Sequence, residues 1–252
     1  MNINKINKYG VSPFKVVLVH GGPGYGAYLK PVCEKIITKF KYGVLEPEQS
    51  KNTVDDQIEE LKNQIESLIE VPITLVGHSW GAWLSFMFTA KYPDLVSNLV
   101  LVSCPAFLKL FDDNRFERRF RNLNSKEVEE LKNSSSDERI EELVQKSEYY
   151  NPSKMLDKNE IGFNEDIFKP VNKQAYSLRD SEKMINSGTT IQCPIVVIHG
   201  DNDPRAPDGV ILPLKGVVKK VDSYIIKNCG HFPWLEKEAE SEFYDVLINV
   251  LN

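Results

Sequence analysis

The sequence has little cysteine and little histidine, four residues of each, and neither type is grouped. The cysteines contain no Cys-x-x-Cys pair, so we expect buried or incidental thiols in a reducing compartment. The histidines lie far apart and lack the spacing of metal ligands on a helix, so we predict no metal and no cofactor. The four cysteines are Cys33, Cys104, Cys193 and Cys229, and the four histidines are His20, His78, His199 and His231.

An excess of positive charge is also lacking, because 31 Lys and Arg stand against 36 Asp and Glu, for a formal net charge of -5. Phosphate binding needs a concentrated basic surface, so we predict no nucleic-acid partner. One local group of arginines is interleaved with acids and is interpreted as a solvated helix face. It comprises Arg115, Arg118, Arg119 and Arg121.

Long hydrophobic runs are the third absence. The chain begins Met1-Asn2-Ile3-Asn4-Lys5, without the apolar stretch of a signal peptide, and no later run approaches membrane-spanning length. We therefore expect a cytoplasmic protein without a membrane partner, and the oligomeric state stays open. At 252 residues the chain is long enough for one large α/β domain with an insertion.

Short apolar runs alternate with helical patterns, which predicts a doubly wound, mostly parallel sheet. The expected strands are 15–20, 43–45, 73–76, 98–103, 194–199 and 224–226, and the expected helices are 28–40, 53–70, 82–90 and 238–251. Thr53 is a candidate N-cap, with Asp55 and Asp56 in the first turn of its helix.

Residues 106–187 differ from the rest, being rich in charge, Asn and Ser with no buried-strand pattern. We interpret them as a helical cap, or lid, inserted into a core domain of residues 1–105 and 188–252. They follow a strand that ends at Ser103, so we expect them to lie over the carboxyl ends of the strands. Their candidate pocket walls are Phe107, Phe111, Phe116, Tyr149, Tyr150 and Phe163.

The segment Gly77-His78-Ser79-Trp80-Gly81 separates a buried strand from an apolar helix. A serine between two glycines at such a tight turn is a nucleophile elbow, which exposes the serine hydroxyl. The start of the following helix adds N–H groups and a partial positive charge, which favour an anionic intermediate. Ser79 is therefore the candidate nucleophile.

Other strand ends supply the remaining groups for acyl transfer, because ligands bind at the carboxyl ends of parallel strands. Serine needs an imidazole base, and the base needs a carboxylate that fixes its tautomer. His231 lies among apolar residues, which suits a neutral base. We choose Asp203 over Asp201 as its partner, because Asp201 follows the strand too closely to turn towards His231.

The other histidines have structural interpretations. His20 and His199 each precede a glycine at a strand end. His78 is adjacent to Ser79 in sequence and is expected to pack within the elbow.

Four segments together resemble the α/β-hydrolase superfamily: His20-Gly21-Gly22-Pro23-Gly24, the elbow, residues 199–204 and Gly230-His231-Phe232. The first two resemble its proline iminopeptidase branch. The resemblance covers residues 15–106 and 193–252. It implies a catalytic triad of Ser79, Asp203 and His231, and an oxyanion hole formed by the backbone N–H groups of Gly22 and Trp80.

The chain departs from that pattern in two places. Only about fifteen residues precede the first strong strand, so we expect a sheet shortened at its N-terminal edge. The segment Glu46-Pro47-Glu48-Gln49-Ser50 lacks the Asp-Gln-Arg-Gly run of the iminopeptidase branch.

The leading functional hypothesis is a serine hydrolase that cleaves a small carboxylic ester, or an amide, through an acyl-enzyme. Its partner is then a small-molecule or short-peptide substrate. One alternative is a proline iminopeptidase-like exopeptidase, whose substrate ammonium group needs lid carboxylates. The candidates for that task are Glu138, Glu141, Glu142 and Glu148. A second alternative is a ligand-binding, receptor-like protein that uses the triad slowly or not at all.

Overall fold

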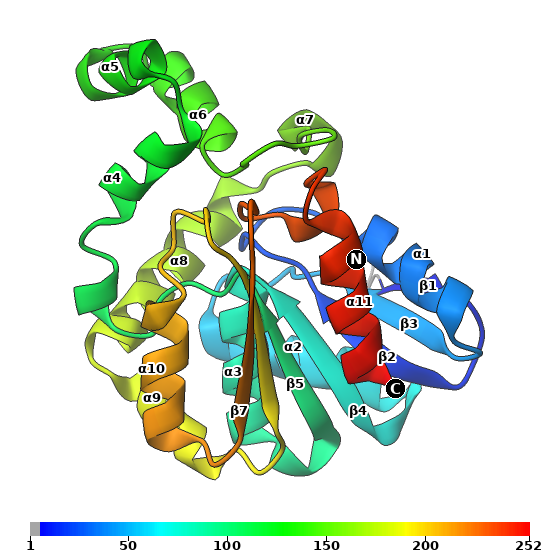
Figure 1. Ribbon diagram of the computed structural model, residues 1–252. Coiled ribbons are helices and arrows are strands. Elements are labelled where there is room, and N and C mark those ends of the chain that lie inside the picture. Colours follow the sequence, from blue (N-terminus) through cyan, green and yellow to red (C-terminus); the bar gives the residue numbers. More distant parts are fainter. Residues whose placement is uncertain (1–5) are drawn as a thin grey trace.

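The computed structural model describes residues 6–252, apart from the side chains of Glu70, Val71 and Lys158. Seven strands form one sheet in the order β1-β3-β2-β4-β5-β6-β7 (Figure 1). They are β1 (Ile6–Tyr9), β2 (Phe14–Val19), β3 (Gly43–Pro47), β4 (Ile69–His78), β5 (Val96–Val102), β6 (Ile195–Gly200) and β7 (Val221–Ile226). β1 is antiparallel to β3, and the other neighbours are parallel.

Helices cover both faces of the sheet, as the alternating pattern predicts. Successive residues of β2 point to opposite faces, so Val17 and Val19 join one core cluster while Val16 and Leu18 join the other. The first cluster includes α2 (Val54–Glu66), α3 (Trp80–Lys91) and α10 (Asp208–Val217). The second includes α1 (Lys30–Lys39) and α11 (Glu240–Leu251). The doubly wound, mostly parallel sheet is therefore confirmed.

One helix ends earlier than the sequence-based expectation. The helix expected over residues 53–70 ends at Glu66, because Ile69 already begins β4 and pairs with Phe14 of β2. Its start is as predicted, since the Thr53 side chain accepts a hydrogen bond from the Asp56 N–H. At the N-terminal edge, the described residues before β2 contribute the single strand β1, as expected for a shortened edge.

Residues 106–187 lie between β5 and β6, and none of their described residues joins the seven-stranded sheet. Their helices are η2 (Lys109–Phe111), α4 (Arg115–Arg118), η3 (Arg119–Asn122), α5 (Ser125–Asn133), α6 (Asp137–Lys146), α7 (Lys158–Ile161), α8 (Glu165–Asp180) and α9 (Lys183–Ser187). Figure 1 shows α5, α6 and α7 beyond the carboxyl ends of the strands, whereas α8 and α9 lie along the side of the sheet.

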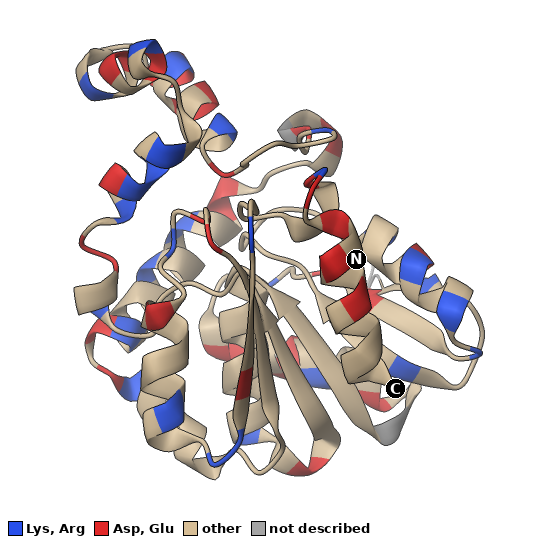
Figure 2. Cartoon of the chain, viewed as in Figure 1, with Lys and Arg blue, Asp and Glu red and all other residues tan. Residues whose placement is uncertain are grey.

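The insertion is thus divided between two positions. Val171 and Ala175 of α8, and Met184 and Ile185 of α9, belong to the core cluster that contains α3. In contrast, α5 and α6 carry interleaved acidic and basic residues at the outer end of the molecule (Figure 2). No helix in the described part of the chain is both long and apolar enough to cross a membrane.

Candidate active site

Ser79 occupies the turn between β4 and α3, with φ 54° and ψ -122°. Its N–H donates to the Val102 carbonyl at 3.0 Å, which ties the turn to the neighbouring strand. A Cβ atom on Gly77 would lie 2.3 Å from the Gly81 carbonyl oxygen, and one on Gly81 would lie 2.1 Å from that of Val19. Both glycines are therefore required by close backbone contacts, as the elbow interpretation predicts.

The two backbone groups expected to bind an oxyanion lie beside this serine. Trp80 is the first residue of α3, where N–H groups have no partner within the helix. Gly22, with φ 64°, follows Gly21, whose own N–H donates to the Tyr28 hydroxyl at 2.8 Å. Gly22, Trp80 and Ser79 all line one cavity.

The structure brings Asp203, and not Asp201, to His231. The Nδ1–H of His231 donates to Oδ2 of Asp203 at 2.7 Å, and both side chains are buried. The other oxygen of Asp203 accepts the Arg205 N–H at 2.9 Å, which fixes the carboxylate within its turn. Asp201 instead accepts hydrogen bonds from the Asn202 amide and from the Cys229 N–H.

Burial and charge set the protonation of this pair. Burial, together with the nearby charge of Arg205, lowers the pKa of His231, and Asp203 opposes the shift only in part. Burial raises the pKa of Asp203, but the positive charge of Arg205 and the hydrogen bond from His231 outweigh burial and hold that pKa well below its usual range. A neutral imidazole therefore faces an ionised carboxylate, with Nε2 left to accept a proton.

The remaining histidines are held by backbone groups, in keeping with their structural interpretation. His78 donates from Nε2 to the His231 carbonyl at 2.9 Å, so its Nδ1 accepts from the Tyr28 hydroxyl at 2.7 Å. His20 donates to the Gly21 carbonyl and His199 to the Arg205 carbonyl, each at 3.0 Å. His78 thus connects the elbow to the loop that carries His231.

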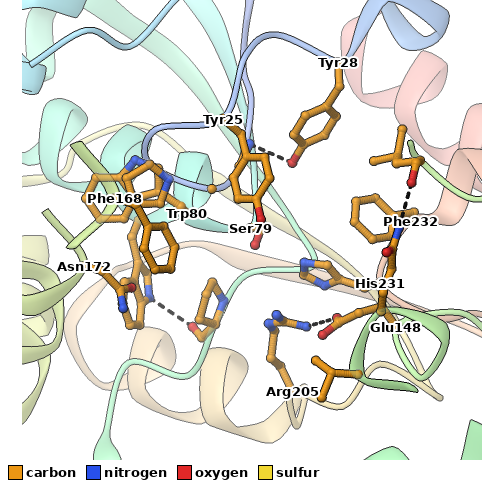
Figure 3. A pocket seen from close by; sticks show the side chains of 18 of the residues that line it. Tyr25, Tyr28, Ser79, Trp80, Glu148, Phe168, Asn172, Arg205, His231 and Phe232 are labelled. Atoms are coloured by element: carbon orange, nitrogen blue, oxygen red, sulfur yellow. Dashed lines mark hydrogen bonds and ion pairs between the residues drawn. The ribbon is translucent and has the colours of Figure 1, made fainter. Parts of the chain in front are cut away.

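A buried ion-pair group beside Asp203 and His231 was not predicted from the sequence. Arg205 pairs with Glu148 of the insertion (Figure 3). Arg205 also lies 3.3 Å from Oδ1 of Asp203. The other carboxylate oxygen of Glu148 lies 2.8 Å from Arg119. The Glu148 carbonyl also accepts the His231 N–H at 2.6 Å. Arg205 could have been noticed in the sequence, because it lies only two residues after Asp203. Its partner Glu148 could not, because it lies 57 residues away in the sequence.

The interpretation of the arginine group as a solvated face was wrong. Arg119 is buried between Glu148 and the Ser147 hydroxyl. Arg118 is partly buried and donates to the carbonyls of Asp203 and Pro204 at 3.0 and 3.2 Å. Only Arg121 of the four is exposed. Arg118 therefore attaches the insertion to the loop after β6, whereas Arg119 is bound within the insertion.

The cavity has a volume of about 370 Å³ and is lined by residues of both the core and the insertion. Of the six aromatic residues expected as walls, Tyr149 alone is among its lining residues. Phe107 is buried in the core instead, and Phe116, Tyr150 and Phe163 are 43 to 49% exposed. The insertion residues that line it include Arg115, Arg119, Val144, Gln145, Glu148, Tyr149, Leu156, Ile161, Phe168, Asn172 and Tyr176.

One group of side chains has the geometry of metal ligands. Ligand atoms of Glu148, Asp203 and His231 lie within 4.8 Å of one another. Arg205 is within ion-pair distance of both carboxylates, however, so a positive charge already occupies the position that a cation would need.

Comparisons with known proteins agree with this architecture. A family model described as alpha/beta hydrolase fold matches residues 38–238. Human monoacylglycerol lipase ABHD6 is 27% identical over 212 residues, which cover 79% of this chain but only 62% of the lipase. Proline iminopeptidase of Lactobacillus delbrueckii subsp. bulgaricus is 25% identical over 260 residues, covering 89% of this chain and 86% of the peptidase.

Solved structures show the same fold. The crystal structure of VinJ has a TM-score of 0.73 at 22% identity, over 98% of this chain and 94% of VinJ. A proline iminopeptidase of Mycobacterium smegmatis has a TM-score of 0.64 at 15% identity. Since the family model spans most of the sequence, the chain belongs to the α/β-hydrolase family.

Proposed function

We propose that this protein is a serine hydrolase that cleaves a small carboxylic ester through an acyl-enzyme. The observation that carries the proposal is the placement of His231. Its Nδ1 is bound to Asp203 at 2.7 Å, while the residue lines the cavity that also contains Ser79 at a strained elbow. This arrangement matches the requirements of an activated serine.

In the first half of the reaction, Ser79 Oγ forms a bond to the carbonyl carbon and gives its proton to Nε2 of His231. The N–H groups of Gly22 and Trp80 stabilise the oxyanion of the tetrahedral intermediate. The ester C–O bond then breaks, and the leaving alkoxide takes the proton from His231. In the second half, a water molecule repeats these steps on the acyl-enzyme and releases the carboxylic acid.

Two features of the site favour this chemistry. Burial lowers the pKa of His231, so the imidazole is neutral and accepts a proton at pH 7. The ionised Asp203 stabilises the imidazolium that forms during the reaction.

The exopeptidase alternative is favoured by the iminopeptidase relative, but the charges of the site argue against it. Of Glu138, Glu141, Glu142 and Glu148, only Glu148 is among the residues that line the cavity. That carboxylate is paired with both Arg119 and Arg205. An ammonium group on the substrate would meet two arginines there, so we place ester cleavage first.

A side-by-side assay tests the proposal. We expect turnover of acyl 4-nitrophenyl esters, no turnover of Pro-4-nitroanilide, and labelling of Ser79 by a fluorophosphonate. Ser79→Ala should abolish turnover and labelling while leaving the fold intact, because alanine fits the elbow. Residual turnover above a few per cent in that variant would remove Ser79 from the nucleophile role. An unlabelled wild-type serine would instead favour a receptor-like protein.

We further propose a cytoplasmic location. The four cysteines are buried free thiols, as expected for a protein that works in a reducing compartment. Fractionation of the producing cell tests this, and recovery from an oxidising compartment would contradict it.

A further inference from the structure

The cavity wall formed by α4 and α8 is rich in hydrogen-bond donors. Arg115 of α4 and Asn172 and Tyr176 of α8 all line the cavity. A guanidinium N–H of Arg115 donates to the Tyr176 hydroxyl at 3.0 Å, which leaves the Tyr176 proton available. Within the described part of the chain the Asn172 side chain has no hydrogen-bond partner, and Figure 3 shows it beside Phe168 at the cavity.

The positive charge of Arg115 is less well balanced by a nearby carboxylate than the charges of Arg119 and Arg205. Its nearest carboxylate oxygen, on Asp112, is 4.0 Å away, and the other oxygen of Asp112 lies 2.7 Å from Arg179. The Arg115 side chain is 27% exposed, so part of it is open to the cavity. In contrast, Arg119 and Arg205 share Glu148, the one carboxylate among the lining residues.

The donors are held in place by packing. The Tyr176 ring packs edge-on against Trp83, with centroids 5.7 Å apart, and the Arg179 guanidinium lies 4.5 Å from the centroid of the Tyr176 ring. Asn172 and Tyr176 lie one helical turn apart and face the same way. A fixed guanidinium, amide and hydroxyl on one wall match the oxygen atoms of a carboxylate.

The position of these donors indicates which part of the substrate they meet. In Figure 3, Asn172 and His231 lie on opposite sides of Ser79. The leaving group must depart beside His231, because His231 protonates it. The acyl group therefore extends towards α4 and α8.

We propose that Arg115, Asn172 and Tyr176 form a subsite for a carboxylate at the far end of the acyl group. The substrate is then the half-ester of a dicarboxylic acid. This inference rests on the proposed ester hydrolysis. Cleavage consumes one water molecule and releases the alcohol and the free dicarboxylic acid, whose second carboxylate stays unchanged on Arg115.

The test compares two esters that differ only in this charge: 4-nitrophenyl hydrogen adipate and 4-nitrophenyl methyl adipate. In the wild type, kcat/KM should be higher for the half-ester. A charged hydrogen bond has the strength to change kcat/KM by roughly 10- to 100-fold. Arg115→Gln should remove a preference of that size. The kcat/KM for the methyl ester should change less than about twofold in the same variant.

Two further variants make the comparison specific. Arg115→Lys keeps the charge and should recover part of the preference. Arg121→Gln removes an exposed arginine from the same segment and should leave the preference unchanged. An equal ratio of the two kcat/KM values in the wild type and in Arg115→Gln would overturn the subsite.

A binding measurement separates this inference from the proposed function. Calorimetric titration with adipate, and with monomethyl adipate as control, needs no turnover. Tighter binding of adipate that is lost in Arg115→Gln supports the subsite even if Ser79 proves unreactive. Equal binding of both compounds overturns it even if neutral esters are hydrolysed.

Discussion

The backbone carbonyl of Glu148 accepts a 2.6 Å hydrogen bond from the N–H of His231, across 83 positions of the sequence that include β6 and β7. The same residue places its carboxylate on Arg205, which contacts Asp203. One residue of the insertion therefore positions the proposed base through its backbone and balances the charge beside the proposed acid through its side chain.

Replacing Glu148 by Gln should move the pH profile of ester hydrolysis. The negative charge of Glu148 raises the pKa of His231, whereas burial and Arg205 lower it, with His78 and His199 also facing this group. Loss of the charge lowers that pKa further. The acid limb of kcat/KM should therefore shift to lower pH, as measured between pH 4 and 8 with a neutral ester.

The same variant should lose stability, because a buried arginine pair is left without its carboxylate, at a cost of about 3–5 kcal/mol. Urea unfolding measures this loss. Glu142→Gln, on the exposed side of α6, is the matched control and should change neither quantity. A Glu148→Gln/Arg205→Gln double variant should be less destabilised than the sum of the single variants. The coupling of Glu148 to Arg205 and His231 would be refuted if the losses in the free energy of unfolding were additive and the acid limb of kcat/KM did not move.

Asp203→Asn should lower kcat by a factor on the order of 10⁴, as expected when the carboxylate that fixes the imidazole tautomer is lost. Asp201→Asn is the control, since Asp201 binds Asn202 and the Cys229 N–H within its own turn. Steady-state rates with one ester suffice for the comparison. A larger effect at Asp201 would show that the acid has been misassigned.

Ser79→Gly should be more stable than Ser79→Ala. Ser79 has φ 54°, a region that costs a residue with a Cβ atom on the order of 1–3 kcal/mol and costs glycine little. Urea midpoints of the two inactive variants measure the strain without interference from turnover. Equal midpoints would mean that the elbow stores no strain in this backbone angle.

Acidification should destabilise the fold in a range set by its histidines. Burial lowers the pKa of His20, His78, His199 and His231 in the native state, so the unfolded chain binds their protons first. Their contribution is complete above the unfolded pKa near 6.5 and is lost as the pH falls below it. Each histidine lowers the free energy of unfolding by up to about 1.4 kcal/mol per pH unit.

Urea unfolding at pH 8, 6.5 and 5.5 measures this dependence. His20→Asn should make it shallower, because it removes one of the four titrating groups. A free energy of unfolding that stays constant down to pH 5.5 would contradict the expected proton uptake.

The elbow and the sheet were predictable because their signals are local. Gly77 and Gly81 are required by contacts within one turn and with β2, and the apolar run of β2 indicates a strand covered on both faces. The pairing of His231 with Asp203 could also be predicted, since both follow neighbouring strands of a parallel sheet.

The insertion was less predictable, because its residues are placed by contacts with distant segments. Phe116 and Phe163 are aromatic, as expected of pocket walls, yet both are exposed. Asn172 lines the cavity, although nothing in the sequence distinguishes it from other polar residues of the insertion. Arg119 lies in a charged stretch that is typical of a solvated helix. Its burial depends on Glu148, 29 residues later, and no periodicity records such a pair.

The contact between the glycine loop and the insertion limits how this protein can be re-engineered. A Cβ on Gly24 would lie 2.3 Å from the carbonyl oxygen of Asn164, and one on Gly26 would lie 2.4 Å from that of Ile161. The Asn164 N–H also donates to the Gly24 carbonyl at 2.7 Å. A cap grafted from a relative would therefore need the glycine loop of that relative as well. In chimeras, the glycine loop and the insertion must be exchanged together.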